Sequence, residues 1–223
     1  MRLRAAYAVS AAVLASAASL ALGGGILSGH GALPSYTGAP TVGGKPAEGD
    51  CTLCHFDPEG SELNPPGGAI EILDLPPTYT AGETYRLRVR LSSDSTAAYA
   101  GRTWGFQLTA ARSSDGEGIG TFELDDPDTL VIESGAGDFA SRFYVQHTIA
   151  GIRDSLAGPV EWAFTWRAPD TPQDTAFFYC IGNAADGSQE PSGDFIYTTA
   201  DTMLDITTPV RPVSWGALKR RYR

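Results

Sequence analysis

One short string in this chain has the residue types and spacing for cofactor chemistry: Cys51-Thr52-Leu53-Cys54-His55. Two thiols separated by two residues can form thioethers with the two vinyl groups of one haem, and the adjacent imidazole can bind the iron as its axial ligand. The chain has only three cysteines and three histidines, so chance rarely assembles this string. The motif therefore predicts one covalent haem c, held by Cys51, Cys54 and His55.

Two other interpretations of the motif stay open. Its two cysteines could form a structural or redox disulfide, although thioredoxin-like motifs begin a helix in a βαβ unit and Phe56-Asp57-Pro58 follows here. Its three side chains could instead bind zinc with a distant fourth ligand, either His147 or Cys180. Without such a role, Cys180 is expected to be a buried free thiol.

A sixth iron ligand would decide whether the haem only transfers electrons or also binds small molecules. After the initiator the candidates are His30, His147 and Met203. A strand period of two would put Phe143, Val145 and His147 on one apolar face, so we expect His147 to point inward. His147 is the preferred second iron ligand beside His55, because a core position explains Met203 and His30 lies beside the leader and could be lost with it. An ordinary buried histidine paired with a polar group explains His147 equally well.

The first residues are typical of an export signal. Met1-Arg-Leu-Arg4 is a positive n-region, and the uncharged run 5–22 is rich in Ala, Val and Leu. We interpret residues 1–28 as a signal peptide or, alternatively, an uncleaved N-terminal anchor. Residues 29–67 are then an irregular Gly/Pro-rich segment that carries CxxCH, 68–208 a β-sandwich domain, and 209–223 a basic tail.

Charge is unevenly distributed along the chain. Between Gly29 and Val210 there are nine basic residues and all 26 acidic ones, whereas five of the last 13 residues are basic. The acidic body would repel phosphate backbones, so nucleic-acid binding is not expected. The basic tail could contact an anionic membrane surface or an acidic partner. Walker-type loops, HExxH and GxSxG are absent, so an electron carrier or binding module is expected rather than an enzyme.

Short segments of alternating apolar and polar residues predict an all-β fold. About eight strands joined by turn-rich loops favour an immunoglobulin-like antiparallel β-sandwich. Arg86, Arg88 and Arg90 should form a solvated face that pairs with nearby acids. The predicted strands are 69–73, 84–91, 104–109, 121–124, 143–148, 160–166, 176–181 and 195–199.

Several strings occur in a fixed order between about Thr37 and Thr199: T-G-A-P, C-x-x-C-H, LPPTYTAGETYRLRVRL, WGFQLTA, YVQHT, WAFTWRAP, FYCIGNAADG and SGDFIYTT. Together they resemble the bacterial secreted Reeler-like domains called choice-of-anchor proteins. The resemblance implies a Reeler-type β-sandwich with an N-terminal CxxCH segment at the cell surface or in the periplasm, and no established reaction. It also implies haem attachment at the motif, with His147 in YVQHT as second ligand. The chain departs from the family in lacking a hydrophobic span after Thr199 and in placing Cys180 where a small apolar residue is expected.

Two functions follow as hypotheses. In the first, the protein is an exported monohaem c-type cytochrome that passes single electrons to an unknown envelope partner. In the second, it is a non-catalytic surface adhesion or interaction module, and CxxCH is a disulfide or zinc staple.

Overall fold

The computed structural model describes residues 31–56, 63–94, 102–172, 174–188 and 190–206. Its strands form two sheets packed face to face, a smaller one in the order β1-β3-β8-β5 and a larger one in the order β2-β10-β9-β4-β7-β6. The strands are β1 (Gly68–Leu73), β2 (Thr78–Tyr79), β3 (Thr84–Ser93), β4 (Thr103–Arg112), β5 (Thr121–Leu124), β6 (Leu130–Ser134), β7 (Phe143–His147), β8 (Val160–Arg167), β9 (Ala176–Ala185) and β10 (Phe195–Asp205). The all-β sandwich is the fold class that the alternating pattern predicts.

The core lies between the two sheets. Strand β3 contributes Leu87, Val89 and Leu91, all fully buried, while the arginines between them face solvent. Strand β8 pairs antiparallel with β3 and adds a row of aromatic side chains to the same core. The fully buried or nearly fully buried aromatic residues of this core include Trp104, Trp162, Trp166, Phe106, Phe164, Phe178, Tyr79 and Tyr197. Burial of large apolar side chains at this density is the main source of the domain's stability.

All eight predicted strands are present, and two more are added. Strand β2 has only two residues and pairs in parallel with the end of β10. Strand β6 extends the larger sheet beyond β7. Strand β1 begins at Gly68, and the domain division into 29–67 and 68–208 stays a prediction; the leader at 1–28 and the tail at 209–223 lie outside the described residues. Met203 and Cys180 are buried in the core.

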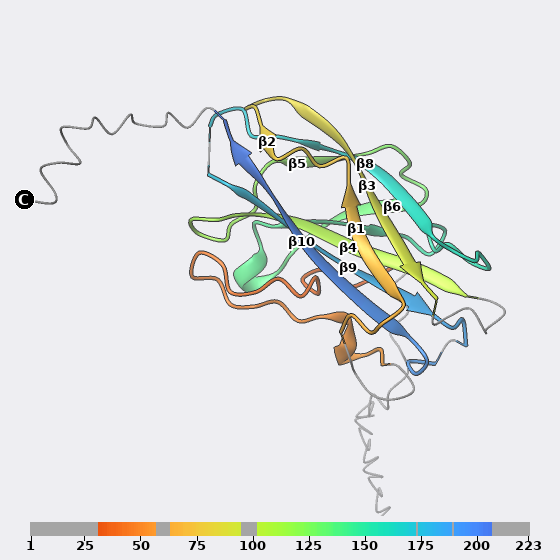
Figure 1. The fold of residues 1–223 in the computed structure, drawn as a ribbon. Helices are drawn as coiled ribbons and strands as arrows, with labels where there is room; N and C mark the ends of the chain where they lie inside the picture. Colours follow the sequence, from red (N-terminus) through yellow and green to blue (C-terminus); the bar gives the residue numbers. More distant parts are fainter. Residues whose placement is uncertain (1–30, 57–62, 95–101, 173, 189, 207–223) are drawn as a thin grey trace, which may run out of the picture.

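Residues 31–56, which we call the strap, cross the outer face of the larger sheet (orange in Figure 1). This segment has no long strand or helix, as its glycines and prolines predict, yet it covers the sheet closely. Ala39 and Val42 pack against Ala111 of β4 and Tyr179 of β9 in a small second apolar cluster. The face of an antiparallel sheet that normally meets water is therefore covered here, and the strap carries the CxxCH motif along it.

Polar side chains of the sheet hold the backbone of the strap. Gln107 of β4, fully buried, donates from Nε2 to the carbonyl oxygen of Leu33 at 2.7 Å and accepts from the Tyr36 amide at 2.9 Å. Gln146 of β7 donates to the carbonyl oxygen of Ala32 at 2.5 Å. Paired buried amides of this kind satisfy a segment that has few backbone partners of its own.

No helix of sufficient length and hydropathy to cross a membrane is found among the described residues.

Candidate haem-attachment site

The CxxCH motif forms one short 3₁₀ turn, η1 (Cys51–Leu53), near one end of the larger sheet (Figure 1). Asp50 caps this turn, because its Oδ1 accepts the Thr52 amide at 2.8 Å. The amides of Cys54 and His55 both donate to the Cys51 carbonyl, at 3.2 and 2.8 Å. Cys54 is the C-cap residue of this turn, so the two cysteines lie at its two ends, three positions apart. This spacing is the one that attachment of both thiols to one haem uses.

The three cysteines, all within the described residues, form no disulfide. Cys54 is exposed and Cys51 is half-buried. Burial, with the nearby negative charge of Asp50, raises the pKa of the Cys51 thiol to about 12. Cys180 lies in the core between the sheets. Its neighbours on β9, Tyr179 and Ile181, face the opposite side by strand alternation, which is the side of the strap. Cys180 therefore belongs to the packing of the core.

His55 is held by a contact that the sequence around it does not predict. Its Nδ1 lies 2.5 Å from Oδ2 of Asp194, in the turn between β9 and β10. Asp194 is 3% exposed, whereas the His55 side chain is 41% exposed. A carboxylate only accepts hydrogen bonds, so the neutral imidazole carries its proton on Nδ1 and keeps a free lone pair on Nε2. His55 is therefore held in the tautomer that binds a metal through Nε2.

Asp194 is itself held from two further directions. Asn183 of β9 donates from Nδ2 to the same carboxylate oxygen at 3.1 Å, and the Asp186 amide reaches Oδ1 at 3.4 Å. The Asn183 amide orientation follows from this bond, because only its NH₂ end can donate to a carboxylate. The Phe56 backbone, next to His55, exchanges hydrogen bonds with 191–194, including the Asp194 amide at 3.1 Å. The loop and the motif are thus fixed to one another.

His147 lies on the strap side of the sheet, not in the core. A Cβ atom placed on Gly105 would stand 2.4 Å from Cε1 and 2.7 Å from Nε2 of His147, so the His147 ring lies directly over Gly105. Gly105 alternates along β4 with Trp104 and Phe106, which point into the core, so the ring occupies the opposite face. Phe143 of the same strand is 44% exposed. The expectation that Phe143 and His147 both point inward is wrong, since the last residue of β7 no longer follows the strand alternation.

The two histidines reach the same part of that face by different contacts. Gly105, which the His147 ring covers, pairs directly with Asn183, the partner of Asp194. The Nδ1 atom of His147 lies 3.0 Å from both the amide nitrogen and the carbonyl oxygen of Phe106. Burial lowers the pKa of His147, because the cationic ring loses its hydration. The Phe106 backbone thus occupies Nδ1 of His147, and the role of His147 as iron ligand stays a prediction.

A second point of the strap, at Glu48, is held by a buried ion pair. Arg142 Nη1 and Glu48 Oε1 lie 2.6 Å apart, both side chains fully buried. Tyr144 donates its hydroxyl to the same oxygen at 2.7 Å. The other oxygen accepts the amide and the hydroxyl of Thr37, at 3.1 and 2.6 Å. Glu48 thus joins the strap to β7 with every contact inside the protein.

Neither Asp194 nor Glu48 is found by reasoning from the sequence. Asp194 is 139 residues from His55, and Arg142 is 94 residues from Glu48. Neither carboxylate stands out in the sequence, because the chain has 26 acidic residues and the tertiary fold decides which of them are buried. No group of three or more His, Cys, Asp or Glu side chains with metal-site geometry occurs among the described residues.

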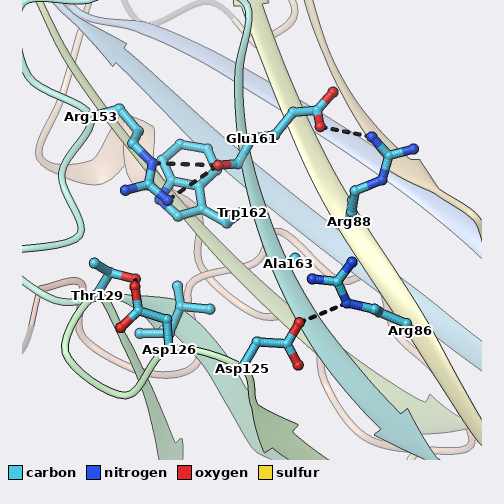
Figure 2. Close-up of a pocket in the computed structure, with 10 residues that line it drawn as sticks. Arg86, Arg88, Asp125, Asp126, Thr129, Arg153, Glu161, Trp162 and Ala163 are labelled. Atoms are coloured by element: carbon cyan, nitrogen blue, oxygen red, sulfur yellow. Dashed lines mark hydrogen bonds and ion pairs between the residues drawn. The ribbon is translucent and has the colours of Figure 1, made fainter.

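A shallow hollow of about 280 Å³ lies elsewhere, on the smaller sheet (Figure 2). Its arginines are paired: Arg86 with Asp125 at 2.8 Å, and Arg88 with Glu161 at 2.8 Å. Arg153 donates to the Glu161 carbonyl and lies over the Trp162 ring. The prediction of a solvated face whose arginines pair with acids is therefore confirmed, and the hollow offers no concentrated charge to a ligand.

No family model matches the chain, and no curated protein matches it. Among solved structures it is similar to the human F-spondin reeler domain, with 15% identity, a TM-score of 0.42, and coverage of 65% of this chain and 94% of that one. It is also similar to a cohesin module of a Clostridium perfringens family 33 glycoside hydrolase, with 9% identity, a TM-score of 0.36, and coverage of 62% and 96%. A conjugative transposon lipoprotein from Bacteroides eggerthii has 13% identity, a TM-score of 0.30, and coverage of 62% and 98%. The resemblance to the choice-of-anchor family stays a prediction.

Proposed function

We propose that this chain is an exported c-type cytochrome-like protein that carries one covalent haem at Cys51 and Cys54, with His55 as axial ligand. The observation that carries the proposal is the His55–Asp194 contact at 2.5 Å, because it leaves Nε2 of a half-exposed imidazole free directly after the pair Cys51 and Cys54. When bound, the haem would supply a one-electron couple between ferric and ferrous iron. The second iron ligand, His147 in this proposal, would be supplied from β7.

The residues present fit such a group in two ways. Both thiols are free and three positions apart in a 3₁₀ turn, which is the donor set that thioether attachment needs. Each S–H bond would add across one vinyl group, with sulfur bonded to one carbon and hydrogen to the other, so no oxidant is required. Leu53, 68% exposed, and Phe56, 38% exposed, supply apolar surface next to the motif. An apolar macrocycle would cover such surface.

The proposal includes export of the protein and its location in the cell envelope. The leader at 1–28 would take the chain out of the cytoplasm to the periplasm or cell surface. A Reeler-type sandwich of the choice-of-anchor kind would then be the rigid body that presents the haem to an envelope electron partner. The acidic body favours a partner with a positive contact surface.

The test is intact mass and a pyridine haemochrome spectrum of the full chain, exported in a host that attaches c-type haem. We expect the added mass of one haem, a thioether-type spectrum, and a proteolytic peptide containing residues 51–55 that carries the group. Cys51→Ala together with Cys54→Ala should abolish attachment. Cys180→Ala is the matched control, because it removes the third cysteine from the core and should leave attachment intact.

A protein two hydrogens lighter than the reduced apoprotein, or one with stoichiometric zinc and no haem, would overturn the proposal. Either result would favour the alternative of a surface interaction module in which CxxCH is a staple. Haem on the Cys180→Ala protein but not on the double variant would support the proposal directly.

A further inference from the structure

We propose that Asp194 is a positioning residue that lowers the reduction potential of the haem site. It contacts Nδ1 of His55, the ring nitrogen opposite the metal-binding Nε2. The inference rests on the proposed function and states what regulates it. The Nδ1 and Oδ2 atoms lie 2.5 Å apart, closer than the roughly 2.7–2.9 Å usual for a charge-assisted N–H···O bond, so the carboxylate is in direct contact with the ring nitrogen. A buried carboxylate at this distance draws the Nδ1 proton toward itself and makes the imidazole a stronger electron donor at Nε2.

Two observations distinguish Asp194 from an ordinary surface carboxylate. It is 3% exposed, so solvent screens its charge weakly at His55. It also accepts from Asn183 and from the Asp186 amide, so its orientation does not depend on His55. A carboxylate fixed by the sheet can impose a position on the ring, whereas a mobile one would only follow it.

The consequence is an expected direction for the reduction potential. A ligand with more negative charge stabilises ferric iron more than ferrous iron, so Asp194 should lower the midpoint potential of the bound haem. The ring orientation depends on a hydrogen-bond acceptor at this position, while the potential depends on its charge. Asparagine keeps an acceptor oxygen and removes the charge, so Asp194→Asn separates the two effects.

The experiment compares the midpoint potentials of the wild-type holoprotein, Asp194→Asn and Asp186→Asn, measured with a mediator-coupled electrode. Asp186 is the matched control: it lies in the same turn, its side chain accepts the Ser188 amide at 2.8 Å, and only its backbone touches Asp194. Both variants remove one negative charge near the motif. We expect Asp194→Asn to raise the potential clearly more than Asp186→Asn does.

A second readout does not need iron. In apoprotein made without haem supply, the His55 ring should show Nδ1 protonated and Nε2 unprotonated by long-range proton–nitrogen NMR, with a low-field Nδ1 proton that Asp194→Asn shifts upfield. Equal potential shifts in the two holoprotein variants would overturn the role of Asp194 while the haem proposal stands. Failure of the wild type to acquire haem would overturn the haem proposal, and the inference about potential with it. A His55 ring protonated on Nε2 in the apoprotein would overturn the inference alone.

Discussion

The strap is joined to the larger sheet by two buried carboxylates, and the two junctions differ in what they leave open. Glu48 has four donors at distances of 2.6–3.1 Å, and its partner Arg142 is fully buried. Asp194 is almost as buried, but its partner His55 is 41% exposed and uses only one of its two ring nitrogens. The contacts of the Glu48 junction all lie inside the protein. At the Asp194 junction, the Nε2 atom of His55 is left to bind a further group.

This difference explains how one segment can be both anchor and site. A buried ion pair holds its position because separating the charges would leave one of them without compensation. The half-exposed imidazole of His55 is held by Asp194 at Nδ1, yet its Nε2 atom can accept a further bond. The Glu48 junction therefore fixes the strap, and the Asp194 junction orients a ligand at its end.

The largest effect is expected from Arg142→Ala, which leaves Glu48 buried without its cation. Breaking a buried ion pair from one side costs about 3–5 kcal/mol, so the free energy of unfolding measured with urea should fall by about that amount. The double variant Arg142→Ala with Glu48→Gln removes the orphaned charge and should recover part of the loss. A loss below about 1 kcal/mol would show that the junction contributes no more than an exposed pair.

Asp194→Ala should cost less and act locally. Hydrogen bonds to charged groups contribute about 1.5–3 kcal/mol, and the groups released here can reach water. Hydrogen exchange should quicken at the amides of Phe56 and Gly193, which bond across this junction, and remain slow at the Glu48 amide, which bonds to Ala39. Equal loss of protection at the Glu48 and Phe56 amides would mean that the two junctions are not independent.

His147 is expected to make a smaller, pH-dependent contribution to the free energy of unfolding. Its folded pKa is lowered by burial, so below about pH 6.5 the unfolded chain binds a proton that the folded protein resists. The stabilisation from neutral His147 is complete above that pH and is lost as the pH falls toward the folded value. The measurement is urea unfolding of the Cys51→Ala, Cys54→Ala protein from pH 7.5 to 5, with and without His147→Gln. The stability advantage of the parent should shrink with acidification; parallel profiles would contradict the assignment.

The sequence predicted the sheets far better than the junctions. The alternation in β3, with Leu87, Val89 and Leu91 inward, depends on neighbours along the chain and could be predicted. Strand β2 was missed because two residues carry no period, whereas β6 has an apolar Leu130-Val-Ile132 run that could have been recognised. The motif itself was visible because its three residues are consecutive or nearly so.

The partners of the motif could not be predicted, for a physical reason. Asp194 meets His55 only because β9 and β10 return the chain to the strap end of the sheet. The inward expectation for His147 failed for a related reason: strand alternation does not extend to a residue whose ring hydrogen-bonds the backbone of Phe106 on the neighbouring strand. Both contacts are set by the tertiary fold, and the periodicity of the local sequence does not predict them.

The smallest effect is expected from Arg88→Ala, the exposed counterpart of Arg142. Arg88 bonds Glu161 at 2.8 Å (Figure 2) and Asp74 at 2.7 Å, distances close to that of the buried pair. Water and salt screen it, because all three side chains are at least 36% exposed. The change in unfolding free energy should be a minor fraction of that for Arg142→Ala and should vanish at 1 M salt, where screening acts over about 3 Å. A salt-independent loss as large as that of Arg142→Ala would mean that burial is not what separates the two arginines, and the contrast between closed and open junctions would lose its physical basis.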